Sequence, residues 1–493
     1  MGYSQFLNMV PEFYLVCILL VVFFMDFFFS RKSGRDHEVF GGVVIGLMLV
    51  LPVRIAFLSE PSEAFGGMYV ASQAANVMKV ILSFGTVIVL IMAEPWLKNE
   101  AQKHRGEFYL LMLSTLLGMF IMVSSGSFLL FFLGLETASV PMACLVAFDK
   151  WKKKSAEAAA KYILVATFSS GVMLYGISFI YAATGTFYFN DVAVAMRAAN
   201  PVYEGVTPLT IMGLVFFFSG LGFKLSLVPF HFWTADTYEG APTPVTGYLS
   251  VCSKGAAAFA AMVILVKAFA PLVEYWEYML YILIVLSITI ANLFAIRQSE
   301  LKRFMAFSSI SQAGYIMLAV IGGSQTGMAS LMYYVLVYVV ANMAVFTVIS
   351  AVENNGQCSM VNGQSLTSMR AYDGLYQTNP KLAFLMTLAL FSLAGIPPFA
   401  GMFSKFFVFM AAAQQGSFWA YLVVFIALVN TVVSLYYYLL IVKAMYIKQS
   451  DMPLPHFQTA PSTKVALAVC TLGIALFGVC SCIYDWLYSV AAF

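Results

Sequence analysis

The sequence contains little charge. Only 10% of its 493 residues are Asp, Glu, Lys or Arg, whereas 61% are hydrophobic. Soluble domains average about 25% charged residues, so a soluble globular protein is excluded. One helix needs about 20 apolar residues to cross a bilayer, and the length leaves room for roughly a dozen or more such helices. The apolar runs are continuous rather than alternating, which excludes a membrane β-barrel.

Patterns that bind soluble ligands are also missing. The net charge is only +3 and no long basic run occurs, so nucleic acid is not an expected partner. The sequence has no phosphate-binding loop, hydrolase elbow, haem motif, zinc spacing or G-x-G-x-x-G, and we expect no cofactor or metal in this chain. Its seven cysteines are scattered. Cys480 and Cys482 are too few for a metal site, and the cysteines are expected to pack as small apolar residues.

Fourteen apolar stretches predict an all-α integral membrane protein with about 14 transmembrane helices. They lie near residues 13–29, 40–58, 77–96, 108–125, 127–148, 157–183, 208–231, 241–269, 273–296, 303–322, 327–351, 380–412, 417–446 and 464–490. The first stretch is followed by Arg31, Lys32 and Arg35 without a small-residue cleavage site. We therefore expect an uncleaved first span rather than a secretory signal.

Lysine and arginine are concentrated in alternate loops. The loops after odd-numbered spans contain Arg31, Lys32, Arg35, Lys98, Lys103, Arg105, Lys150, Lys152, Lys153, Lys154, Arg297, Lys302, Arg303, Arg370 and Lys448. The even loops are nearly bare, with Arg197 as the clear exception. Because basic loops remain in the cytoplasm, the odd loops are predicted to be cytoplasmic and both termini to lie on the opposite side.

Two spans contain proline in mid-membrane. Pro229 lies in the seventh span, and Pro397 and Pro398 lie in the twelfth. Proline removes a backbone donor, which a membrane helix tolerates where the freed groups face protein or water. Broken helices in corresponding positions are typical of inverted-repeat transporters. We expect a three-helix segment (1–100), two inverted five-helix repeats (101–270 and 271–450) and a C-terminal transmembrane helix (451–493).

Five ionisable residues lie within apolar runs: Glu136, Lys161, Lys224, Lys254 and Lys405. A charge at the centre of a membrane helix costs about 2.5–3.5 kcal/mol on insertion scales, so these residues are expected to be functional. Glu136 and Lys161 could pair across neighbouring spans, either as a static lock or as part of a proton path. The other three lysines have no carboxylate within a helical turn. Burial favours the neutral form of an unpaired amine, which suits a proton relay.

Three further ionisable residues follow the break in the seventh span. His231 lies seven residues after Lys224 and could transfer protons, or it could form hydrogen bonds at the end of the broken helix. Asp236 and Glu239 could line a route for proton uptake or simply face water. Four other basic residues near span ends are expected to extend their charge to the interface: Lys79, Arg54, Lys267 and Lys443.

These residues resemble a known family. Residues 222–233 read Gly-Phe-Lys-Leu-Ser-Leu-Val-Pro-Phe-His-Phe-Trp, and residues 238–245 read Tyr-Glu-Gly-Ala-Pro-Thr-Pro-Val. Both runs are similar to the antiporter-like membrane subunits of respiratory complex I, as are residues 302–310 and 394–398. The resemblance covers roughly residues 100–445. The form of residues 238–245, together with Lys254, is most similar to subunit N rather than subunit L or M.

The resemblance implies specific roles for the membrane charges. Glu136 and Lys161 would be the charged pair near a half-channel, and Lys224 the lysine of the broken helix. Lys254 would be the central lysine and Lys405 the lysine of the second half. The chain would then belong to a proton-translocating NADH-quinone oxidoreductase, an enzyme complex, without performing redox chemistry itself.

The resemblance also implies partners and a location. NADH, FMN, iron–sulfur clusters and quinone would be bound by partner subunits. The neighbours in the lipid bilayer would be other membrane subunits, including another antiporter-like subunit and small membrane subunits. The location would be a bacterial cytoplasmic (inner) membrane, with both termini periplasmic. One alternative is a subunit of a multisubunit sodium/proton antiporter with the same fold. Another is a redox subunit that binds quinone itself, for which the sequence shows no motif.

Overall fold

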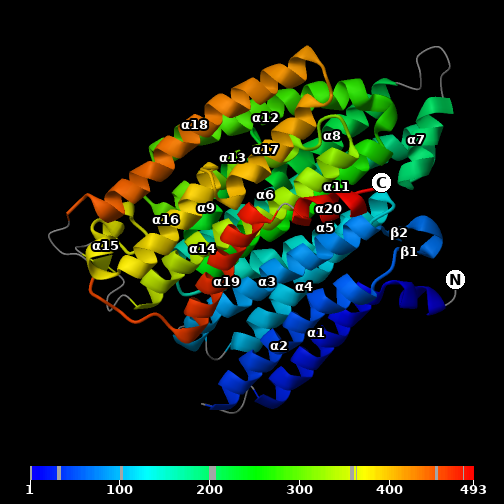
Figure 1. Cartoon of the computed structure of the whole chain (residues 1–493). Helices are drawn as coiled ribbons and strands as arrows, with labels where there is room; N and C mark the ends of the chain where they lie inside the picture. The colour runs from blue at the N-terminus through cyan, green and yellow to red at the C-terminus, as the bar shows by residue number, and fades with distance from the viewer. Residues whose placement is uncertain are drawn as a thin grey trace.

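The computed structural model describes residues 3–29, 35–99, 101, 104–198, 207–355, 360–361, 364–449, 454–480 and 482–492. The basic residues Arg31, Lys32 and Lys103, used above to predict orientation, lie outside the described residues. Most of the described chain is helical, and the long helices pack side by side in one bundle (Figure 1). Both ends of the chain lie at the same end of this bundle (Figure 1).

The helices and strands follow one another in a simple order. The α-helices are α1 (Val10–Phe29), α2 (Arg35–Leu58), α3 (Gln73–Asn99), α4 (Arg105–Val123), α5 (Phe128–Val146), α6 (Lys153–Thr184), α7 (Phe189–Ala198), α8 (Pro208–Leu225), α9 (Phe232–Gly240), α10 (Thr243–Tyr248), α11 (Lys254–Lys267), α12 (Val273–Ile296), α13 (Leu301–Leu318), α14 (Gln325–Asn355), α15 (Leu375–Thr378), α16 (Pro380–Ala394), α17 (Ala400–Ala413), α18 (Phe418–Tyr446), α19 (Pro461–Val479) and α20 (Cys482–Val490). The 3₁₀ turns are Tyr3–Asn8, Phe65–Gly67, Ala270–Leu272 and Met369–Tyr372, and a π-helical turn covers Leu249–Ser253. Two small antiparallel hairpins pair β1 (Ser62–Ala64) with β2 (Tyr69–Ala71) and β3 (Met360–Val361) with β4 (Gln364–Ser365).

Twelve helical segments of the described chain are long and apolar enough to cross a membrane. They coincide with twelve of the predicted spans. The last of these is shorter than predicted because helix α19 ends just before Cys480, and α20 is a separate helix. The other two predicted spans correspond to α13 and to the pair α16 and α17. Helix α13 is more polar than the twelve because it has two basic residues in its first turn and contains three serines and Gln312. Helices α16 and α17 are too short to be counted as one span, because the segment between Ala394 and Ala400 is not helical.

The helix is interrupted at both of the proline positions predicted from the sequence. Helix α8 ends at Leu225, six residues before the predicted end, because Ser226 adopts a left-handed conformation with φ 61°. Helix α16 ends at Ala394, and the next residue, Gly395, has a φ of 88° that glycine adopts at little cost. The Val228–Pro229 and Pro397–Pro398 peptide bonds are cis.

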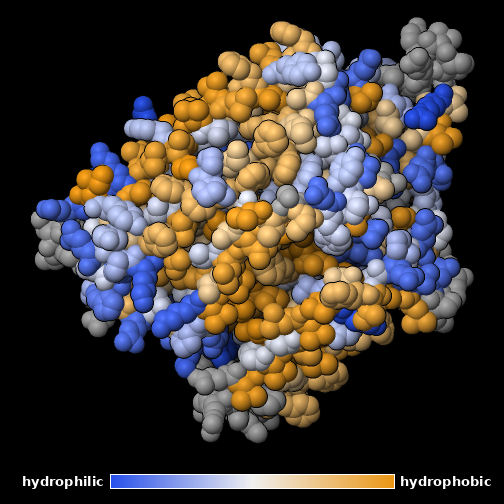
Figure 2. Space-filling view, viewed as in Figure 1, coloured by the Kyte–Doolittle hydropathy of each residue, from blue (hydrophilic) through white to orange (hydrophobic). Residues whose placement is uncertain are grey.

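The interior of the bundle is polar as well as apolar. Helices α11, α13 and α14 are buried on nearly all sides, whereas α1, α2, α6 and α18 present many apolar side chains outward. Figure 2 shows hydrophobic side chains over the middle of the viewed face and hydrophilic residues towards its two ends. This distribution fits a protein surrounded by lipid between two aqueous surfaces. We call the end formed by residues 148–154 and 297–303 the basic end.

Candidate functional site: a buried axis of lysines

Lys224 lies in the last turn of α8, directly before the break. Its side chain is buried, and its Nζ donates a hydrogen bond of 2.8 Å to Oγ of Ser139 on α5. Glu136 lies three residues before Ser139, on the same face of α5. The Glu136 side chain is half-buried, and it forms no ion pair with Lys224 in the described chain. Lys224 therefore contacts the face of α5 on which Glu136 lies one turn before Ser139.

The prediction that Lys161 pairs with Glu136 is wrong. Its Nζ lies 2.7 Å from a carboxylate oxygen of Glu157 and 2.7 Å from one of Asp236. Glu157 lies one helical turn earlier on α6. Asp236 lies on α9, the short helix that follows the break after α8. The side chain of Lys161 is 45% exposed in this chain, so it is not one of the deeply buried charges.

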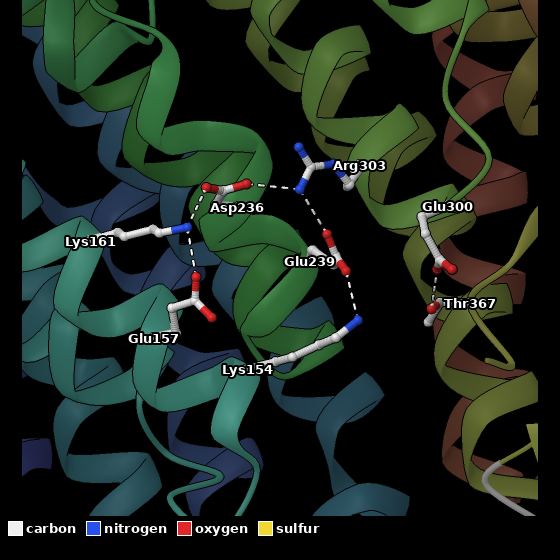
Figure 3. A network of polar contacts seen from close by, with 8 residues as sticks. All are labelled: Lys154, Glu157, Lys161, Asp236, Glu239, Glu300, Arg303 and Thr367. Atoms are coloured by element: carbon white, nitrogen blue, oxygen red, sulfur yellow. Dashed lines mark hydrogen bonds and ion pairs between the residues drawn. The ribbon is translucent and has the colours of Figure 1, made fainter.

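Lys161 belongs to a network of ion pairs at the basic end (Figure 3). Arg303 on α13 contacts both Asp236 and Glu239 on α9, each at 2.8 Å. Lys154 at the start of α6 also pairs with Glu239, at 2.8 Å. The network thus links α6, α9 and α13 around a cavity of about 220 Å³.

The charges of this network determine whether its two carboxylates, Asp236 and Glu239, are ionised near neutral pH. Burial raises the pKa of Asp236, but its bonds to Lys161 and Arg303 outweigh that effect and leave the pKa below its ordinary value. Burial likewise raises the pKa of Glu239, and the bonds to Lys154 and Arg303 lower it further than burial raises it. Both carboxylates therefore remain ionised at neutral pH.

Lys254 lies at the centre of the bundle, just after the π-helical turn. Its side chain is 1% exposed, and its Nζ donates a 2.7 Å hydrogen bond to Oγ of Ser309 on α13. The same Nζ lies 5.6 Å from the ring centroid of Tyr238, whose hydroxyl is 3.4 Å from Ser309 Oγ. Lys254 has no ion-pair partner among the residues that the structure describes. Its contacts within the described part of the chain are with neutral groups, Ser309 and the ring of Tyr238.

Lys405 is buried on α17, after the second break. Its Nζ donates a 3.0 Å hydrogen bond to the carbonyl of Ala394, at the C-terminal end of α16, and lies 4.9 Å from the ring centroid of Tyr315. A helix C-terminus carries partial negative charge, which favours a cation there. Gly401 permits α17 to pack closely against α16, since a Cβ at this position would lie 1.6 Å from the carbonyl oxygen of Ser392. The described chain offers Lys405 no carboxylate partner either.

Polar side chains of α13 lie near both Lys254 and the end of α16 that binds Lys405. Beyond Ser309, which binds Lys254, Gln312 donates to the carbonyl of Leu393, the residue before Ala394, at 3.3 Å. Gln312 also contacts the hydroxyls of Tyr334 and Tyr438, and Tyr438 in turn contacts Ser308. Helix α13 therefore supplies one polar contact to Lys254, through Ser309, and a second polar group, around Gln312, beside the end of α16 that binds Lys405.

Several buried hydroxyls near the first break make no hydrogen bond to the described chain. They are Tyr162, Ser226, Thr234, Thr237 and Ser253, and Nδ1 of buried His231 also has no partner. Because buried polar groups are normally hydrogen-bonded, we expect water between Lys224 and Lys254. His231 stands at the start of α9, not on a continuous helix with Lys224.

Two other lysines are also buried, although the sequence does not indicate it. Lys79 was expected to reach the interface, but it is fully buried and lies 2.6 Å from Glu12 of α1 and 3.0 Å from the hydroxyl of Tyr69. Lys302 is buried beside a cavity of about 240 Å³, and its Nζ donates to the carbonyl of Ala241 at 2.6 Å. The partners of both lysines lie in other helices or loops, which a single span does not reveal.

Comparison with known proteins agrees with this architecture. The family described as NADH:quinone oxidoreductase/Mrp antiporter, TM matches residues 125–434, more than half of the chain. A protein of Phocaeicola vulgatus named NADH-quinone oxidoreductase subunit N is 55% identical over 492 residues, 100% of each chain. A protein of the same name from Desulforamulus reducens is 35% identical and covers 96% of this chain and 95% of its own.

Solved structures share the fold. A chain of respiratory complex I from Thermus thermophilus superposes with a TM-score of 0.76 at 29% identity, covering 95% of this chain and 97% of that chain. A chain of the Mrp complex from Dietzia sp. has a TM-score of 0.82 at 20% identity, with 98% and 97% coverage, and indicates the fold alone. The identity to the full-length relatives is decisive: this chain belongs to the NADH-quinone oxidoreductase subunit N family.

Proposed function

We propose that this chain is a proton-translocating membrane subunit of an NADH-quinone oxidoreductase, and that protons cross it along Glu136, Lys224, Lys254 and Lys405. One observation supports this path above all. Three lysines are buried within the bundle, and each donates to a neutral acceptor and has no ion-pair partner among the described residues. A static structural lysine is normally paired, because an isolated buried charge is costly.

The immediate partners of these lysines suit reversible protonation. A serine hydroxyl can accept a hydrogen bond from an ammonium and can also donate one to a neutral amine. Ser139 and Ser309 can therefore satisfy Lys224 and Lys254 in either protonation state. The tyrosine, serine and amide groups of α13 would pass the proton on towards Lys405.

Glu136 would couple the relay to the rest of the complex. Two charges 4 Å apart interact by about 4 kcal/mol at an effective dielectric constant of 20. A shift in the position of Glu136 or Lys224 would therefore change the proton affinity of Lys224, and then of Lys254, by more than tenfold, since about 1.4 kcal/mol is a factor of ten. Asp236 and Glu239, held ionised, would form the proton-uptake surface at the basic end.

We further propose a fold of fourteen spans containing two inverted five-helix repeats. The repeats would cover residues 101–270 and 271–450, after a three-helix segment (1–100) and before a C-terminal part (451–493). The similar breaks after α8 and α16, each preceding or following a buried lysine, support this division. Redox chemistry with NADH, FMN, iron–sulfur clusters and quinone would occur in partner subunits. The neighbours would include a second antiporter-like subunit.

Purification of the native assembly tests the proposal. A C-terminal affinity tag on this chain should recover a complex that oxidises NADH and contains iron–sulfur subunits. Recovery of a complex without NADH oxidation, in which sodium drives proton movement, would instead identify an antiporter and contradict the proposal.

The buried lysines should tolerate neutralisation far less than a surface lysine. We expect Lys224→Ala and Lys405→Ala to lower NADH-driven proton pumping by roughly a hundredfold at the transfer step, the usual contribution of one proton-transferring group. Lys153→Ala is the matched control, since Lys153 is exposed at the basic end. Pumping in membrane vesicles is the measurement. If all three variants behave alike, the buried lysines are structural.

Orientation can be tested without a functional assay. We propose that the basic end is cytoplasmic and both termini periplasmic, in a bacterial cytoplasmic membrane. In a chain without its native cysteines, Lys153→Cys should react with an impermeant thiol reagent only from the cytoplasm, and Gln414→Cys only from outside. The reverse pattern would mean that the protein has the opposite orientation in the membrane. Labelling of both cysteines from one side would contradict the number of spans proposed between positions 153 and 414.

A further inference from the structure

A buried carboxylate lies at the end of the bundle opposite the basic end. Glu277 belongs to the second turn of α12, and the other end of that helix, at Ile296, reaches the basic end. Glu277 is 9% exposed and has no ion-pair partner among the described residues. Glu274, one turn earlier on the same helix, is exposed. A buried carboxylate without a cation is costly unless it is hydrogen-bonded, so its hydrogen-bond partners matter.

Neutral groups hold the Glu277 carboxylate in place. The backbone N–H of Gly322 donates to one of its oxygens at 3.3 Å, and Nε2 of Gln415 donates to the other at 2.6 Å. Two hydroxyls orient the Gln415 amide, because its Oε1 accepts from Tyr281 at 2.9 Å and from Ser417 at 2.6 Å. Protonation of Glu277 would therefore break no ion pair in the described chain.

The carboxylates of the network at the basic end are bound differently. Asp236 and Glu239 are each paired with two basic side chains, so a proton that binds to either would displace a cation. Glu277 has only neutral partners in the described chain, and a carboxyl group can accept hydrogen bonds when ionised and donate one when protonated. Of these three carboxylates, Glu277 is therefore best suited to bind and release a proton.

The segments that donate to Glu277 also flank Lys405. Helix α13 places the ring of Tyr315 beside the Lys405 ammonium and continues to the turn that contains Gly322. Helix α17 contains Lys405 and leads to Gln415, just beyond its end. At about 1.5 Å of rise per residue, Gln415 lies roughly 15 Å further along the chain than Lys405. Both segments thus run from Lys405 to Glu277, away from the basic end.

We propose that Glu277 is the group from which protons leave this chain, after Lys405, on the side opposite the basic end. This inference rests on the proposed function, because it takes Lys405 as the last lysine of the path. Lys405 would transfer its proton through water to the Glu277 carboxylate, which accepts it and becomes a neutral acid. Glu277 would then lose the proton to the aqueous phase beside the start of α12 and return to the carboxylate.

Variants of the intact complex test this role in sealed membrane vesicles. Glu277→Gln removes the acid and should lower NADH-driven proton pumping roughly a hundredfold at the release step. Glu277→Asp keeps an acid and should retain most of the pumping. Glu274→Gln removes an exposed carboxylate from the same helix and should pump normally. Pumping is normalised to the amount of assembled complex.

The pH dependence of NADH oxidation separates proton release from a structural role. It is measured in uncoupled vesicles, in which both sides of the membrane have the same pH. Because Glu277 must lose its proton in every cycle, the native rate should fall as the pH becomes acidic. Glu277→Asp should shift this acid limb of the profile and Glu277→Gln should remove it, whereas Glu274→Gln should leave it unchanged.

The outcomes distinguish failure of this inference from failure of the proposed function. Native pumping by assembled Glu277→Gln, together with loss in Lys405→Ala, would overturn the role of Glu277 and leave the path of lysines intact. Loss in Glu277→Gln with a native acid limb in both Glu277 variants would also overturn it, because Glu277 would then be structural. If Glu277→Gln does not assemble, an unshifted acid limb in Glu277→Asp overturns the inference. Native pumping in both Glu277→Gln and Lys405→Ala would contradict the proposed function itself.

Discussion

Replacement of Lys254 by arginine is expected to leave the complex assembled but to abolish most NADH-driven proton uptake. Lys254 is almost completely buried and bound by Ser309 and the ring of Tyr238. Arginine keeps the positive charge and the ability to donate to Ser309, but it cannot release its proton at physiological pH. If Lys254 carries protons, the transfer step should slow by roughly a hundredfold or more.

The readout for Lys254→Arg is proton uptake by inverted membrane vesicles, normalised to the amount of assembled complex. Lys153→Arg, in the exposed start of α6, is the matched control and should pump normally. Native pumping by an assembled Lys254→Arg complex would mean that only the charge of Lys254 is needed and that protons bypass it.

Replacement of Glu136 by glutamine should cause near-complete loss of pumping. Glutamine keeps the size of the side chain and leaves Ser139 in place to bind Lys224, but it removes the negative charge on the helix face that Lys224 contacts. Without that carboxylate, the proton affinity of Lys224 can no longer be switched by movement of a charge pair. Proton uptake by membrane vesicles is again the measurement.

The control for Glu136→Gln is Glu157→Gln, which removes a carboxylate that is 65% exposed and paired with Lys161. This variant should lose little activity, because exposed ion pairs contribute little. Full activity of an assembled Glu136→Gln variant would contradict the role of Glu136 in the relay.

The sequence predicted the features that depend on one span. Long apolar runs locate the helices because lipid demands about 20 apolar residues in a row. Pro229 and Pro397 indicate the interruptions because proline cannot continue a helix without a cost. Lys224, Lys254 and Lys405 were identified as buried because each lies far from a polar loop.

Features that depend on two distant segments were not predictable. Lys161 and Asp236 are 75 residues apart in the sequence, and they pair only because the chain turns back after α8. Lys79 looked like a residue that reaches the interface, but Glu12 and the β1–β2 hairpin, which carries Tyr69, cover it. Ser309 could have been suspected from the polar run inside α13, yet its contact with Lys254 requires the packing of two helices.

The most direct test of the account is the number of protons moved per NADH oxidised by the intact complex in sealed vesicles. The comparison is between native chains and chains carrying Glu136→Gln or Lys254→Arg, at equal complex content. We predict that each variant lowers this ratio or stops NADH oxidation altogether, because the relay through this chain is blocked. An assembled variant with both a native ratio and a native rate of NADH oxidation would show that protons do not pass along this axis.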